Sequence, residues 1–180
     1  MKGNLLKDKK FPAFAIAMLI LVVICYFNYK LSSQFVSYTI ASIFTALLAI
    51  EDINEKKISN ILLLAMLGIS IVAVALTMNV NIYISSFISG ILMFLLMLVM
   101  YFISMRNLGF GDVKLMSIIA FLIGFVDAMQ LMFMTLVLTV IGGIIICILK
   151  KGNLKSEVPM IPYVFAALFV NNVMILAAGR

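Results

Sequence analysis

The sequence predicts an all-α protein that crosses a membrane about seven times, with six crossings as the alternative count. Of its 180 residues, 66% are hydrophobic and only 11% are charged, and the mean hydropathy is +1.27. Soluble domains carry about 25% charged residues, so a chain of this composition belongs in a membrane. The apolar residues also gather in runs that approach the ~20 residues needed by one membrane-spanning helix.

The apolar runs follow one another with short polar breaks. The first four are Phe11–Phe27, Phe35–Ile50, Ile58–Met78 and Ile82–Met105. A longer tract from Val113 to Leu149 holds one charged residue after Lys114 at its start, Asp127, and is too long for one crossing. We divide it at Asp127, which we expect in an outer turn within reach of water. The last run is Val158–Ala178.

Two of these runs are short, and both stop at a carboxylate. The run Phe35–Ile50 reaches Asp52, and the run that begins at Val113 starts beside Asp112. We expect both helices to continue through these aspartates, which would hold the two acids at the membrane boundary or just inside it.

The basic residues predict the orientation, because cytoplasmic loops carry an excess of Lys and Arg. With the N-terminus in the cytoplasm and seven crossings, eleven of the 13 basic residues lie inside. Only Lys30 and Arg180 then lie outside, and Asp52 and Asp112 both come out on the cytoplasmic side. The short basic clusters thus fit membrane orientation better than a nucleic-acid surface.

The residue types that are missing exclude several chemistries. The chain has no histidine, so it can build no Ser-His-Asp triad, Cys-His dyad or HExxH zinc site. Its two cysteines, Cys25 and Cys147, lie alone in separate apolar runs and cannot form a CxxC pair. We expect neither a metal nor another cofactor.

The stretch Asn107–Leu115, NLGFGDVKL, places Asp112 beside two glycines. Gly109 and Gly111 would let the backbone take conformations closed to other residues and approach another chain closely. A substrate peptide contacted along its main chain requires such an approach. Taken alone, the string is more simply a turn in which Asp112 caps the following helix.

Asp52 is the second candidate, and the pair is more informative than either acid alone. Asp52 alone would be an interfacial charge paired with Lys56, and a structural role is expected for the other acids, Asp8, Glu51, Glu55, Asp127 and Glu157. Ionisable residues at membrane depth are costly and tend to be functional. Two adjacent carboxylates can share one proton, so that one acts as base and the other as acid, which is the aspartic-protease mechanism.

At these motifs the chain resembles the type IV prepilin peptidase family. Asp52 followed after five residues by Ile58-Ser59-Asn60 is similar to that family's Asp, short charged stretch and Ile-Pro-Asn. The segment Gly109–Leu115 resembles its Gly-x-Gly-Asp-x-Lys-Leu motif, and VPMIPYVFAA, from Val158 to Ala167, resembles the start of its last helix. The resemblance covers about residues 41–167.

The resemblance implies an intramembrane-type aspartic endopeptidase. Such enzymes remove the basic leader of prepilins, pseudopilins or preflagellins at the cytoplasmic face of the cell membrane. Asp52 and Asp112 match the family's catalytic aspartates, and Gly109 and Gly111 match the glycines that shape the site. Larger relatives carry an N-terminal CxxC extension and methylate the product. We find no such extension and expect one domain over residues 1–180 that cleaves without methylating, like the short forms of Tad-type pili or archaeal preflagellin systems.

The sequence leaves open the roles of two residues near the motifs and the effect of one departure from the family pattern. Lys114 could act on Asp112 or steer an acidic part of a substrate, but a positive-inside anchor is the favoured interpretation. Asn60 could bind substrate or orient Asp52, or it could satisfy backbone at a helix start. Ser59 replaces the family's proline, and a serine can cap the same helix.

Two other functions compete with the peptidase. One is a small transporter or channel whose carboxylates relay protons or bind a cation, which would place the acids near the bilayer midplane in broken helices. The other is a catalytically inactive subunit of an assembly system, in which both aspartates would be replaceable. The sequence leaves the exact substrate and the oligomeric state open.

Overall fold

The computed structural model describes residues 11–30, 32–55, 58–77, 79–104, 108–149 and 159–177. Within these residues the chain forms seven α-helices and no strand, which confirms the all-α prediction. The helices are α1 (Phe11–Tyr29), α2 (Ser33–Glu55), α3 (Asn60–Ala75), α4 (Val80–Ile103), α5 (Phe110–Ile123), α6 (Phe125–Leu149) and α7 (Ile161–Ala177).

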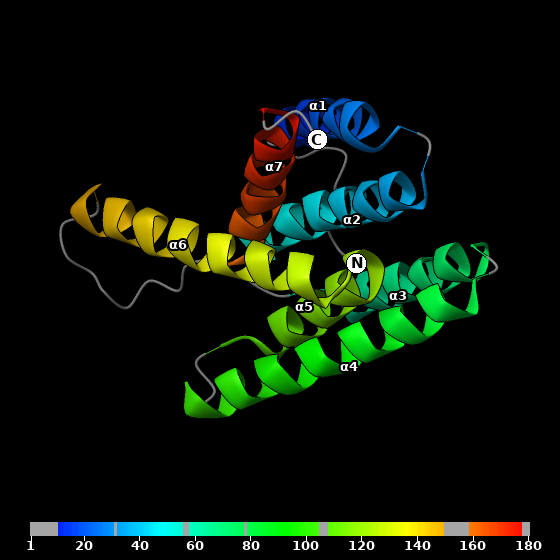
Figure 1. Ribbon diagram of the computed structural model, residues 1–180. Helices are drawn as coiled ribbons and strands as arrows, with labels where there is room; N and C mark the ends of the chain where they lie inside the picture. The colour runs from blue at the N-terminus through cyan, green and yellow to red at the C-terminus, as the bar shows by residue number, and fades with distance from the viewer. Residues whose placement is uncertain are drawn as a thin grey trace.

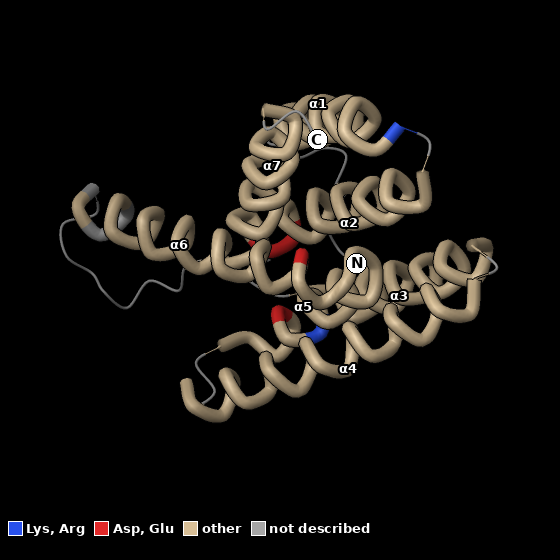
Figure 2. The backbone as a smooth tube through the Cα atoms, viewed as in Figure 1, with Lys and Arg blue, Asp and Glu red and all other residues tan. Residues whose placement is uncertain are grey.

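The helices have the length and composition of a multi-pass membrane protein. Among the described residues, α1, α2, α4 and α6 are long and apolar enough to cross a bilayer, and α3 and α7 are shorter apolar helices. Large apolar side chains lie exposed along their outer faces, as contact with lipid requires. Figure 2 shows how few charged residues the described helices carry.

The helices form two groups that meet at α5. In Figure 1, α1, α2 and α7 pack together on one side, while α3, α4 and α5 pack together on the other. The two groups are joined by contacts of α2 with α3 and α5, and by α6, which packs on α4, α5 and α7. α5 is therefore the central helix, and most of its residues are buried.

Both predicted helix extensions are confirmed, but the division of the long tract at Asp127 is wrong by three residues. α2 runs through Asp52 to Glu55, and α5 includes Asp112 in its first turn. The break between α5 and α6 falls at Gly124, whose φ of 94° favours glycine. Asp127 lies in the first turn of α6, where it accepts a hydrogen bond from the Tyr38 hydroxyl at 3.4 Å.

Candidate active site

Asp52 lies near the end of α2, at the point where the start of α7 meets that helix. Its side chain is 8% exposed, and its Oδ2 atom accepts a hydrogen bond from the Ile161 backbone N–H at 3.1 Å. Ile161 is the first residue of α7, where a helix leaves N–H groups without partners in its own backbone. The Asp52 carboxylate therefore caps the N-terminus of α7, which comes much later in the chain.

Asp112 occupies the first turn of the central helix. Its side chain is buried, 9% exposed. The residue at the N-cap position is Gly109, so Asp112 caps α5 from the third helical position and not from the N-cap itself. The Asp112 carboxylate turns back to the Gly109 backbone, from which it receives a hydrogen bond. This bond holds the carboxylate at the start of α5.

The fold brings Asp52 and Asp112 together. α2 packs on α5, and the two carboxylates are near enough for their negative charges to interact. In Figure 2 the acidic residues, in red, lie in the central part of the fold. The two buried aspartates thus lie within electrostatic reach of each other, although two complete helices, α3 and α4, separate them in the chain.

The two glycines of the motif act through close packing rather than through unusual backbone angles. Among the described glycines only Gly124 has a positive φ, so the expectation of permissive backbone at Gly109 and Gly111 is wrong. A Cβ atom at position 109 would lie 2.8 Å from Oδ2 of Asp112. A Cβ at position 111 would lie 2.5 Å from Cδ1 of Ile58, which follows α2 and precedes α3. Gly109 thus makes room for a carboxylate, and Gly111 lets the connection after α2 approach α5.

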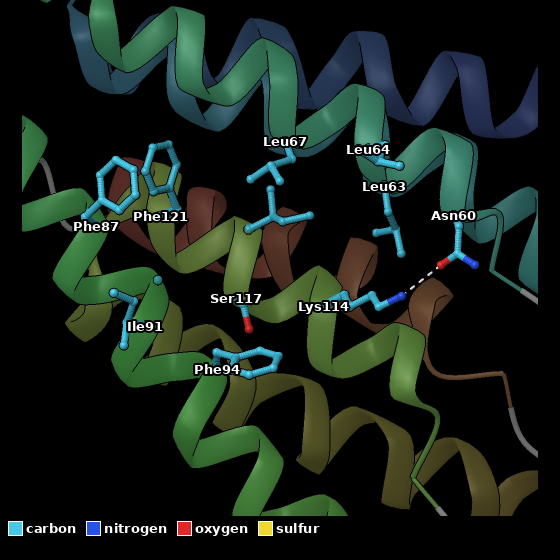
Figure 3. A pocket seen from close by; sticks show the side chains of 12 residues that line it. Asn60, Leu63, Leu64, Leu67, Phe87, Ile91, Phe94, Lys114, Ser117 and Phe121 are labelled. Atoms are coloured by element: carbon cyan, nitrogen blue, oxygen red, sulfur yellow. Dashed lines mark hydrogen bonds between the residues drawn. The ribbon is translucent and has the colours of Figure 1, made fainter.

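Lys114 of α5 and Asn60, the first residue of α3, contact each other. The Lys114 Nζ atom donates a hydrogen bond to Oδ1 of Asn60 at 3.0 Å, and it lies 5.2 Å from the centre of the Phe110 ring. Figure 3 shows this bond joining the starts of α3 and α5. Lys114 therefore has a partner other than Asp112, and Asn60 uses its side-chain oxygen for that lysine.

The start of α3 is held by an acid that the sequence did not single out. Ser59 takes the N-cap position, but its hydroxyl makes no capping hydrogen bond, contrary to expectation. The Ser59 backbone N–H instead donates to Oε2 of Glu51 at 3.3 Å. Glu51, expected to be an interfacial charge, thus ties the residue before α3 back to α2. The contact of Ile161 with Asp52 was also missed, although two prolines beside that residue marked a helix start.

The family assignment agrees with this arrangement. The type IV leader peptidase family matches residues 39–149, which is more than half of the chain, and the chain belongs to that family. No curated protein and no solved structure matches the chain. Membership gives the protein a peptidase role on prepilin-like substrates. The matched range includes Asp52 and Asp112 but ends before α7.

Proposed function

We propose that this leader peptidase cuts its substrate with Asp52 and Asp112 acting as one acid–base pair. One carboxylate is ionised and removes a proton from a water molecule, whose oxygen attacks the carbonyl carbon of the peptide bond. The other carboxylate is protonated and donates its proton to the carbonyl oxygen. The tetrahedral intermediate then collapses: the leaving amine takes the proton from the protonated carboxylate, and a hydroxyl of the intermediate gives its proton to the ionised one, which leaves one proton on the pair. This chemistry uses no metal or other cofactor.

The proposal rests on one observation: both acids are buried, and they lie close enough for their charges to interact. Isolated carboxylates are costly to bury, yet each of these is at most about a tenth exposed and lies within reach of the other's charge. Each also accepts one backbone hydrogen bond, from Ile161 or from Gly109. Such bonds fix the orientation of the carboxylates that the reaction requires.

The proposed location of the reaction is the cytoplasmic face of the cell membrane. The excess of Lys and Arg in one set of connections supports a cytoplasmic N-terminus, and it favours the same side of the membrane for the starts of α3 and α5. A prepilin, pseudopilin or preflagellin has a basic leader followed by an apolar helix in the bilayer. A site at this depth would meet the junction without unfolding that helix. We propose that residues 1–180 form one peptidase domain.

Cleavage of a co-expressed prepilin tests this function. Membranes containing the protein and one of several prepilins should yield a shortened product, and mass spectrometry of its N-terminus should place the cut between the basic leader and the apolar segment. The product should carry no added methyl group. Processing at an unrelated bond, or proton flux through vesicles without any processing, would favour the competing transporter.

A further inference from the structure

The start of α7 supplies the backbone N–H that Asp52 accepts, so the position of this helix determines how the carboxylate is held. The Ile161 side chain is fully buried, and its N–H lies 3.1 Å from Oδ2 of Asp52. The next two backbone N–H groups, of Tyr163 and Val164, donate to the Met160 carbonyl. Of these three amides, only that of Ile161 holds the carboxylate.

The same helix start is in tight contact with α6. The Tyr163 ring lies directly on Gly142 of α6, where an added Cβ atom would overlap its hydroxyl oxygen and Cζ and would lie 2.5 Å from its Cε1. No other described glycine has so close a neighbour. Figure 1 shows the start of α7, in orange, beside α6. The start of α7 is therefore held between α6 and the carboxylate of α2.

Position 142 requires a glycine because of this contact and not because of its backbone. Among the described glycines only Gly124 has a positive φ. At Gly143, the next residue along α6, nothing lies within 4 Å of an added Cβ atom. A glycine inside a helix costs about 0.5–1 kcal/mol relative to alanine. The space taken by the Tyr163 ring is thus the structural reason for the glycine at position 142.

The far end of α7 is fixed by separate hydrogen bonds to α1 and α6. Oδ1 of Asn171 accepts from Nε2 of Gln130 at 3.3 Å. The Asn172 backbone carbonyl accepts from Nδ2 of Asn28 at 2.8 Å, and its Oδ1 accepts from the Cys25 thiol at 3.5 Å. Because these bonds hold the far end, a displacement of the start of α7 does not require release of the whole helix.

We propose that Tyr163 is a positioning residue for Asp52, and that its ring, seated on Gly142, sets the distance between α6 and the start of α7. This inference rests on the proposed function and deepens it. A methyl group at position 142 would push the ring and the helix start away from α6, or would release the ring from its seat. Either change moves the Ile161 N–H away from the carboxylate that it orients. The reaction depends on that orientation, since a misplacement of about 1 Å can cost ~100-fold in rate.

Two neighbouring glycines provide the matched test. Gly142→Ala and Gly143→Ala gain the same helix propensity, but only the first methyl group meets Tyr163. For a prepilin, Gly142→Ala should lower kcat at least about tenfold with KM within about twofold of the wild type, and Gly143→Ala should change neither. Tyr163→Ala should also lower kcat, whereas Tyr163→Phe, which keeps the ring, should retain most of it.

Hydrogen–deuterium exchange at single-amide resolution reads the same contact without catalysis. In detergent, the Ile161 amide should exchange about tenfold faster in Gly142→Ala than in Gly143→Ala, because it loses its acceptor. Amides in the middle of α4 should exchange at the wild-type rate in both variants, which shows that the fold is intact. Asp52→Ala gives the exchange rate of the Ile161 amide without its acceptor.

The outcomes separate the positioning role from the peptidase function. Equal Ile161 exchange in the two alanine variants would overturn the role of Tyr163, as would faster exchange with unchanged kcat in a chain whose wild type cleaves a prepilin. Faster exchange in Gly142→Ala, in a chain whose wild type cleaves no prepilin, would support the hold on Asp52 and count against the proposed peptidase. If Gly142→Ala does not fold, Tyr163→Ala against Tyr163→Phe decides by the same two measurements.

Discussion

The Asp52 carboxylate and the Ile161 backbone N–H form a hydrogen bond of 3.1 Å across 109 residues of chain. This bond gives Asp52 a structural role beside its proposed catalytic one. Since the N–H belongs to the first residue of α7, loss of the acceptor would leave that helix start without its partner.

Different substitutions of Asp52 should separate these two roles. Asn keeps an acceptor oxygen and caps helices about as well as Asp, so Asp52→Asn should abolish cleavage without lowering thermal stability. Asp52→Ala should abolish cleavage and also cost about 1 kcal/mol, the usual loss for a removed cap. Thermal unfolding in detergent measures the difference, and equal melting temperatures for Asn and Ala would contradict the capping role.

Gly109→Ala should reduce cleavage through the position of Asp112. The added Cβ would lie 2.8 Å from Oδ2, and the flexible end of the carboxylate can yield without disturbing the fold. We therefore expect kcat to fall at least about tenfold with little change in stability. Gly68→Ala is the matched control, because nothing lies within 4 Å of a Cβ there. A kcat equal to that of the control would show that Asp112 does not need this space.

Gly111→Ala should destabilise the site by forcing the Ile58 side chain away from α5. Overpacking of this kind typically costs about 1–3 kcal/mol. Ile58→Ala removes Cδ1 and Cγ1, two of the three Ile58 atoms that the new methyl group would meet, and keeps only Cβ, at 3.0 Å. The double variant should therefore recover stability and cleavage relative to Gly111→Ala. If the losses of stability caused by Gly111→Ala and by Ile58→Ala simply add in the double variant, this contact is not the reason for the glycine.

Asp127→Asn should leave cleavage within about twofold of the wild type, because Asp127 follows the opposite end of α5 from Asp112. An asparagine oxygen can still accept the hydrogen bond from Tyr38. Processing assays on matched membrane preparations check this. A large loss would place a third acid in the reaction and would require a different mechanism.

The sequence predicted the helices well because lipid imposes a length and composition on each crossing. The apolar runs marked α1 to α4 and α7 to within a few residues, and the basic clusters marked the connections. The break at Gly124 was missed because the division followed Asp127, the only charge in the tract after Lys114. A glycine that turns the chain through a positive φ carries no hydropathy signal.

The site was predictable in its residue types but not in its contacts. The two aspartates stood out as acids at the ends of short apolar runs, and the predicted topology put both on one side of the membrane but left open whether they meet. The bonds from Ile161 to Asp52 and from Ser59 to Glu51 arise from tertiary packing, which local patterns do not encode. The same holds for Gly111, whose neighbour Ile58 comes from a different part of the chain.

The most direct test of the account is cleavage of a prepilin by Asp52→Asn, Asp112→Asn and the double variant, at matched protein levels. If the carboxylates act as one pair, each single substitution should lower kcat at least ~100-fold. The kcat of the double variant should then be no lower than that of the less active single variant. Asp127→Asn serves as the control acid. Processing that survives both single substitutions, or losses that multiply in the double, would contradict a shared acid–base pair.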